Sequence, residues 1–339
     1  MPHVTFIHGI ANKPRAEQLL DIWRGRLADG DGIDLGAQGI TSSMVYWADV
    51  MYDQPLAEAA VESATDEAAG EASAQAPPDL GLDEMDAAER LWVASLAAKL
   101  AVPLAASEIA GAVEATGAGG AAGAAKTAEA TAAVTAAAAA GAAASPVKAT
   151  LELIPLPWAV KEPIMRRLLR DVHHYLWNVD YSPRPGASFK VQDEIRGRMI
   201  RALEEGAAAE PPHVVVSHSM GTVIAYDCLK RVAAAPVVQG LMTVGSPLGL
   251  DEIRDKLKPE WTRADGFPLP RVQGRWVNVY DRLDPVAGFG PRLAKDYRDA
   301  GREVVDDLNE QNYGAWRHDI GKYLAGPELR GKLRLLLGL

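Results

Sequence analysis

The feature that most constrains the fold of this 339-residue chain is an apolar run that passes through a short turn into a helical pattern. The run is 214–216, the turn is the pentapeptide SHSMG at 217–221, and the helical stretch covers 222–232. Such a run predicts a buried strand, and the small residues two positions before and after Ser219 permit a tight, strained turn. We therefore expect the Ser219 hydroxyl to stand clear of a strand end, with the Met220 amide at a helix N-terminus.

Strand-like segments recur along the chain with helical patterns between them. Besides 213–216, the expected strands cover 3–7, 41–47, 240–244, 276–280 and, with a weaker pattern, 303–305. Expected helices begin after Pro14, at Ile164 and at Ile195, where apolar residues recur at helical spacing. About six strands interleaved with helices predict an α/β fold with a doubly wound, mostly parallel sheet, in which sites lie beyond the carboxyl ends of the strands.

The composition changes sharply between the two parts of this pattern. Residues 54–163 are rich in Ala, Gly and Glu, and 132–144 is almost entirely alanine, which favours helices that bury little area per residue. We expect an α/β core formed by 1–53 and 164–339, interrupted by an Ala-rich helical insertion at 54–163. The insertion is either a cap or lid over a cleft or a solvated excursion of low complexity.

Charge and cysteine content exclude several classes of function. The net charge of −10 at pH 7 repels a phosphate backbone, so nucleic acid is not an expected partner. Cys228 is the only cysteine, which excludes an internal disulfide and a multi-thiolate metal site. The N-terminus lacks a signal-peptide pattern, and the uncharged run 130–147 lacks the large apolar residues of a membrane span. A cytoplasmic location is the expectation.

An acid and a histidine that suit the serine follow it along the chain, each after an expected strand. Asp284 is the favoured acid, and Asp281 is the alternative, whose other role would be an ion pair with the adjacent arginine or a turn cap. His318 is the only histidine after the turn. In such a triad the imidazole takes the serine proton, and the carboxylate fixes the imidazole tautomer. The competing interpretation is that Ser217 or Ser219 simply caps the following helix.

The end of the first expected strand provides further candidate groups. It reads His8-Gly9-Ile10, and Gly9 would let the backbone approach a reacting carbonyl. The Ile10 amide is the expected second donor to an oxyanion, beside the Met220 amide. His8, Gly9 and His218 are the core residues that we expect to contact a substrate.

Together these motifs resemble the α/β-hydrolase superfamily, on its lipase and carboxylesterase side. The resemblance covers roughly 1–53 and 164–339 and leaves the insertion unexplained. It implies the α/β-hydrolase fold, a serine nucleophile, an acyl-enzyme and no cofactor or metal. The segments that carry it are His8-Gly9, Ser217-His218-Ser219-Met220-Gly221, Gly245-Ser246-Pro247, Asp284-Pro285-Val286 and His318.

The expected reaction is hydrolysis of a small-molecule or lipid ester by Ser219, His318 and Asp284. If Leu156 and Trp158 of the insertion line an apolar entrance, an apolar acyl group is favoured. The insertion would then also provide a peripheral contact with a membrane or lipid. The same stretch could instead pack the insertion on the core. Acyl transfer and cleavage of a thioester or amide share the same tetrahedral intermediate and stay open, as does a non-catalytic binding module. The oligomeric state is not predicted.

Overall fold

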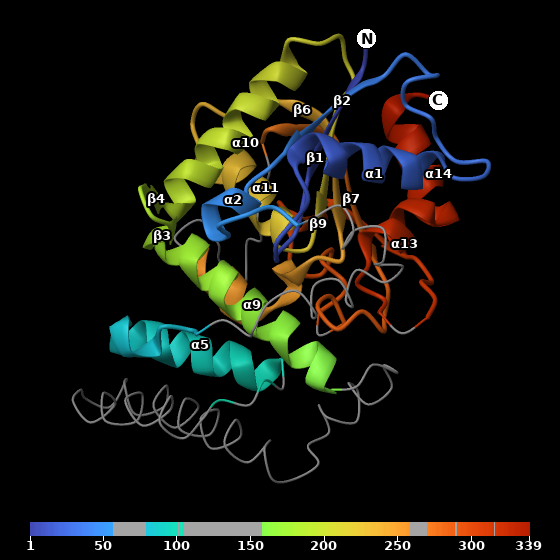
Figure 1. The fold of residues 1–339 in the computed structure, drawn as a ribbon. Helices are drawn as coiled ribbons and strands as arrows, with labels where there is room; N and C mark the ends of the chain where they lie inside the picture. The colour runs from blue at the N-terminus through green and yellow to red at the C-terminus, as the bar shows by residue number, and fades with distance from the viewer. Residues whose placement is uncertain are drawn as a thin grey trace.

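The computed structural model describes residues 1–56, 79–100, 102, 104, 158–257, 270–288, 290–314 and 316–339. Within them, a six-stranded sheet is flanked by helices on both faces (Figure 1). From one edge to the other the strands are β10 (Val305–Asn309), β7 (Val272–Tyr280), β6 (Val238–Val244), β5 (His213–His218), β1 (His3–Ile7) and β2 (Thr41–Val45). Every pairing between neighbours is parallel, which confirms the predicted α/β class with a parallel sheet.

The direction in which the chain adds strands reverses at β1. The strand β2 is placed on one side of β1, and the chain then returns to the other side and adds β5, β6, β7 and β10 in order. Such a reversal marks the position where sites form in open α/β sheets, beyond the carboxyl ends of the two strands concerned. Ile7 at the end of β1 pairs with Ser217 in β5, so the residues that follow these strands emerge side by side.

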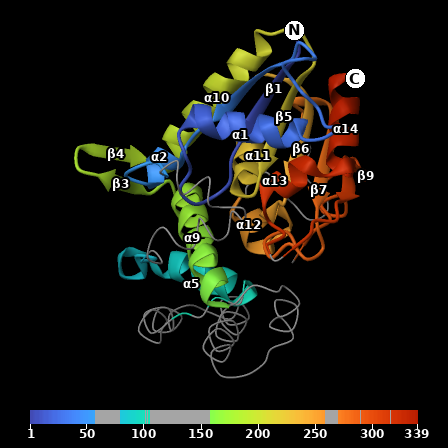
Figure 2. The same ribbon diagram turned by 45° about the vertical axis from the view of Figure 1, so that its right-hand side comes forward.

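Alternate residues of β5 pack into two separate cores, because successive side chains of a strand point to opposite faces. Val214 and Val216 belong to one core and Val215 to the other. The first face is covered by α1 (Ala16–Ala28), α13 (Ile320–Ala325) and α14 (Pro327–Leu337) (Figure 2). The second face is covered by α10 (Val191–Ala207) and α11 (Met220–Arg231), and α9 (Trp158–Trp177) packs against α10. The sheet is therefore covered on both sides, as its fully apolar strands require.

Shorter elements connect these layers. The short helices are α2 (Ala48–Met51), α12 (Asp251–Lys256) and the 3₁₀ turns η1 (Leu82–Glu84) and η3 (Pro247–Gly249). Two antiparallel hairpins lie outside the main sheet, β3 (Asp180–Arg184) with β4 (Ala187–Lys190), and β8 (Arg298–Asp299) with β9 (Arg302–Glu303). The β3–β4 hairpin and the helices α13 and α14 are additions to the elements predicted above.

Among the described residues, one α-helix lies wholly within the predicted insertion, α5 (Ala87–Lys99). Its N-terminus is closed by a capping box of Asp86 and Glu89. The indole Nε1 of Trp92 in this helix donates to the backbone oxygen of Glu252 in α12 at 2.9 Å. Figure 1 shows α5 and the first half of α9 beyond the carboxyl ends of the strands. The helix α9 runs without a break through position 163, where the insertion was expected to end. None of the helices described above has the length and apolarity needed to cross a membrane.

Candidate active site

Ser219 occupies the turn between β5 and α11 in a backbone conformation that favours glycine, with φ +53° and ψ −128°. The turn is held at both sides of the residue, because the Ser219 amide donates to Val244 O at 2.9 Å and Thr222 donates its amide and hydroxyl to Ser219 O. The Ser219 side chain makes no capping hydrogen bond to α11. Ser217, the other serine of the turn, donates its hydroxyl to Met242 O in β6 at 3.0 Å. Neither serine therefore acts as the helix cap that the competing interpretation required.

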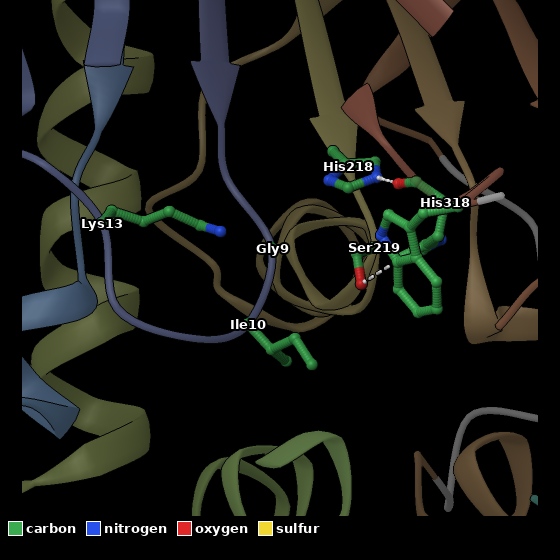
Figure 3. A pocket seen from close by; sticks show the side chains of 7 residues that line it. Gly9, Ile10, Lys13, His218, Ser219 and His318 are labelled. Atoms are coloured by element: carbon green, nitrogen blue, oxygen red, sulfur yellow. Dashed lines mark hydrogen bonds between the residues drawn. The ribbon is translucent and has the colours of Figure 1, made fainter. Parts of the chain in front are cut away.

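The three side chains expected to form the triad meet at this turn. His318 Nε2 lies 2.9 Å from Ser219 Oγ (Figure 3). On the other side of the ring, His318 Nδ1 lies 2.9 and 2.8 Å from the two oxygens of Asp284. All three residues are buried, with at most 4% of each exposed. A carboxylate at Nδ1 fixes the proton there and leaves Nε2 as the acceptor for the serine proton.

Asp284 is held in its ionised form by its surroundings. Its Oδ1 accepts the amides of Val286 at 2.7 Å and Ala287 at 3.0 Å, and its Oδ2 accepts the Tyr323 hydroxyl at 2.8 Å. Burial by itself would raise the pKa of Asp284, but the charge of His318 and these hydrogen bonds hold the pKa below its ordinary value. The carboxylate therefore carries the negative charge that an imidazolium at 318 needs beside it.

The alternative acid, Asp281, has a different set of partners. Its carboxylate accepts the amides of Leu283 and Asn312, each at 2.7 Å, and forms an ion pair with Arg317 at 3.1 Å. It therefore serves both as a turn cap and as an ion-pair partner, with Arg317 rather than with the adjacent arginine. These contacts hold the loop that leads into His318, while Asp284 contacts the imidazole itself.

Two glycines allow the end of β1 to lie directly against the Ser219 turn. A side-chain Cβ at Gly9 would lie 2.6 Å from Ser219 Cβ, and one at Gly221 would lie 2.6 Å from His8 O. Both distances are too short for any real contact, so only glycine fits at these positions. The close approach brings Ile10 and Ser219 into the lining of one pocket. Among the described residues, neither the Ile10 amide nor the Met220 amide donates a hydrogen bond, as expected of donors kept for an oxyanion.

The two histidines expected to contact a substrate have packing roles in the structure. His8 is fully buried, stacks on Trp47 at 4.8 Å and accepts the Trp47 amide at Nε2, so that its Nδ1–H donates to Gly9 O at 2.7 Å. His218 donates from Nε2 to His318 O at 2.9 Å, and the two imidazole rings lie 4.7 Å apart. His8 therefore orients the Gly9 loop, and His218 orients His318 while also lining the pocket.

A small pocket, with about 10 Å³ of space for the centre of a water molecule, opens in front of the serine (Figure 3). Its lining residues are Gly9, Ile10, Lys13, His218, Ser219, Trp316 and His318. Sequence reasoning missed Lys13 and Trp316 in this lining, and Tyr323 behind Asp284. Trp316 and Tyr323 flank His318 closely in sequence, but no local pattern distinguishes them from ordinary core aromatic residues. Leu156 and the Trp158 side chain lie outside the described residues.

The site can therefore place a serine oxygen and an imidazole nitrogen at one small pocket that Ile10 also lines, with Met220 directly after the serine at the start of α11. In the described part of the chain, no group of three His, Cys, Asp or Glu side chains is arranged to hold a metal ion. Comparison of the chain with protein-family models, with curated proteins and with solved structures finds no match to any of them.

Proposed function

We propose that this protein is a serine hydrolase that cleaves carboxylic esters through an acyl-enzyme intermediate. The observation that carries the proposal is the continuous hydrogen-bonded chain from Ser219 through His318 to Asp284, built on a strained strand-to-helix turn. A serine used only for packing has no need of a positive φ, which costs about 1–3 kcal/mol and persists only where the surrounding structure enforces it. The order serine, acid, histidine along the chain and the position of the serine at the strand-order reversal support an α/β-hydrolase assignment.

The proposed reaction begins when Ser219 Oγ attacks the ester carbonyl carbon and passes its proton to His318 Nε2. The carbonyl oxygen becomes an oxyanion that the Ile10 and Met220 amides stabilise, and Asp284 stabilises the imidazolium. His318 then returns the proton to the departing alkoxide, which leaves as the alcohol and yields the acyl-enzyme. Water repeats the sequence with His318 as base, and it releases the carboxylic acid and restores Ser219.

The proposal is tested with a fluorophosphonate probe and a series of p-nitrophenyl esters of increasing acyl length. We expect the probe to label Ser219, and Ser219→Ala to lower kcat by about 10⁶-fold, as loss of a serine nucleophile does elsewhere. The matched control is Ser217→Ala, which removes a buried serine of the same turn whose hydroxyl is bonded to Met242 O. Equal ester hydrolysis by the wild type and Ser219→Ala would exclude the mechanism.

We further propose that α5 belongs to a cap that shapes the acyl pocket. Its support is the position of α5 and the start of α9 beyond the carboxyl ends of the strands (Figures 1 and 2). The helix is attached to the core at Glu252, whose carboxylate accepts Ser95 Oγ and Lys99 Nζ, each at 2.9 Å. We expect Glu252→Ala to change the ratio of kcat/KM between long and short esters and to leave the rate for the shortest ester intact. An unchanged ratio would exclude the cap role of α5.

A further inference from the structure

The loop that carries the Ile10 amide adopts an unfavourable backbone conformation immediately after it. Ala11 has φ +68°, in the left-handed region that residues other than glycine rarely occupy. A loop with such a residue keeps its shape only where other contacts hold it. Further along, the loop is tied to the segment after α2 by Asn12 Nδ2, which donates to Gln54 O at 2.7 Å, and by the Leu56 amide, which donates to Lys13 O at 3.0 Å.

A further contact to this loop comes from a carboxylate 160 residues from Ala11. Asp171 of α9 is fully buried, and its Oδ2 accepts the Ala11 amide at 3.4 Å and the Tyr52 hydroxyl at 3.1 Å. Burial and the Asp171 charge raise the pKa of Tyr52 well above its ordinary value, so this hydroxyl remains a donor at all working pH values. One carboxylate oxygen therefore joins α9, the residue after α2 and the oxyanion loop.

The other oxygen of Asp171 is bound by Arg170, whose positive charge neutralises the carboxylate. Arg170 donates to Asp171 Oδ1 from Nε at 2.9 Å and from Nη2 at 2.7 Å. The guanidinium is kept in place between two aromatic rings, 5.0 Å from the centre of Tyr52 and 6.0 Å from that of Tyr181. Because the pair carries no net charge, Asp171 can hold the loop without placing an uncompensated negative charge near a developing oxyanion.

We propose that Asp171 is a positioning residue for the oxyanion hole, which acts by holding the Ala11 amide and so aiming the neighbouring Ile10 amide at the reacting oxygen. This inference rests on the proposed hydrolase function. Donor alignment matters for catalysis because a backbone amide lowers the barrier only when it is already aimed at the oxyanion. A loop that lost this contact would still bind a substrate but would stabilise the transition state less well.

A second buried carboxylate provides a matched control. Asp227 of α11 is also fully buried, accepts a tyrosine hydroxyl from Tyr175 at 2.7 Å and is paired with Arg196 at 2.7 and 2.9 Å. Its contacts join α9, α10 and α11, and none of them reaches the oxyanion loop. The two sites therefore share a buried carboxylate that binds a tyrosine hydroxyl and an arginine. Asp227 has a further arginine partner, Arg231 of its own helix, at 3.4 Å, and Asp171 has the loop amide.

The test compares Asp171→Asn with Asp227→Asn. An asparagine presents an amide NH₂ where one carboxylate oxygen stood, so it cannot accept from both Arg170 and the loop. Because each single variant leaves an arginine without its partner, a second pair of variants removes the carboxylate together with its closest arginine, Arg170→Met/Asp171→Leu and Arg196→Met/Asp227→Leu, a type of replacement that often preserves the fold. In the second of these, Arg231 keeps a partly exposed side chain. Circular dichroism and thermal unfolding identify which variants are folded.

The readouts are kcat and KM for a short p-nitrophenyl ester and the inhibition constant of a trifluoromethyl ketone. Ser219 Oγ bonds to the ketone carbon of this probe, its proton passes to His318, and the ketone oxygen becomes an oxyanion. We expect the Asp171 variants to lower kcat roughly 10- to 100-fold with little change in KM, and to raise the ketone inhibition constant by a similar factor, since loss of a whole oxyanion donor costs about 10²–10³. The Asp227 variants should lose thermal stability with kcat and the inhibition constant unchanged.

The possible results separate the two proposals. If folded Asp171 variants keep the wild-type kcat and ketone inhibition, or lose no more than the Asp227 variants do, Asp171 has only a structural role and the inference is wrong. If the wild type neither hydrolyses esters nor binds the ketone, the proposed function itself fails.

Discussion

Tyr323 of α13 donates its hydroxyl to Asp284 Oδ2 at 2.8 Å, and the same hydroxyl oxygen accepts the Asp281 amide at 2.8 Å. Burial and the charge of Asp284 raise the pKa of Tyr323 well above its ordinary value, so the hydroxyl stays a donor. One buried phenol thus fixes the distance between the acid that contacts His318 and the strand end from which that acid emerges. The first prediction follows from this arrangement.

Tyr323→Phe should lower the free energy of unfolding by about 1.5–3 kcal/mol, because it removes a hydrogen bond to a buried charged group. It should also lower kcat several-fold, since the acid loses one of its fixed contacts. The matched control is Tyr297→Phe, because the Tyr297 hydroxyl is buried and donates at 2.9 Å to the neutral carbonyl of Leu248. That control should cost about 1 kcal/mol and leave kcat unchanged. Urea unfolding and steady-state kinetics measure both; equal effects on kcat would contradict the role of Tyr323.

Asn substitutions separate the two candidate acids. Asp284→Asn should lower kcat by about 10³–10⁴-fold, because the imidazole loses both the fixed tautomer and the charge beside its protonated form. Asp281→Asn should lower the thermal midpoint, since it breaks the ion pair with Arg317 at 3.1 Å, while its effect on kcat stays below that of the first variant. The same esters serve for both variants. A larger loss of kcat in Asp281→Asn would reverse the assignment of the acid.

Gly9→Ala tests the close approach of β1 to the serine turn. The added methyl group would lie 2.6 Å from Ser219 Cβ, so either the loop or the turn must move. We expect kcat to fall by about 10²-fold or more, as displacement of an oxyanion donor does. Gly25→Ala in α1 is the control, because nothing lies within 4 Å of the new methyl group and alanine stabilises a helix by roughly 0.5–1 kcal/mol relative to glycine. Unchanged kinetics in Gly9→Ala would mean that the loop adapts freely.

The buried side chain of His213 should make the folded protein less stable in mild acid. Burial, followed by the charge of His3, lowers the pKa of His213 from 6.5 to about 4, while in the unfolded chain it stays near 6.5. Between these values the unfolded chain binds more protons than the folded protein, so the free energy of unfolding falls as the pH falls from about 6.5 to about 4, by up to about 3 kcal/mol. The stability that comes from keeping His213 buried and neutral is fully present above pH 6.5 and is lost below pH 4.

His213→Gln is the corresponding variant, because it removes the titrating group and keeps a polar side chain opposite Thr5, whose hydroxyl lies 2.9 Å from His213 Nε2. Urea unfolding of both proteins at a series of pH values should give a shallower decline for the variant across this window. Parallel declines would show that other groups cause the acid sensitivity of the fold.

The sequence alone predicted the central strands, because fully apolar runs such as 214–216 suit only positions covered on both faces. It also selected Ser219, Asp284 and His318, since small residues around the serine and the order of the three groups are visible without coordinates. Its weakest strand, expected at 303–305, lies instead at Val305–Asn309. Two aspartates interrupt the apolar pattern there. One of them, Asp307, is bonded by Asn278 and by the amides of Leu293 and Ala294, so tertiary contacts permit polar residues in this strand.

The tertiary structure decided how the site is supported. Strand order brought the ends of β1 and β5 together, and some of the contacts that hold Asp284 and the loop after β1 come from residues distant in the chain. Asp171 lies 160 residues from the Ala11 amide that it binds, and Tyr323 lies 39 residues from Asp284. A local sequence pattern reflects the periodic burial of neighbouring residues. A single buried hydrogen bond between distant segments produces no periodic pattern in the sequence. The chemical groups of the candidate site can therefore be identified from the sequence, while the contacts that orient them form only when the chain is folded.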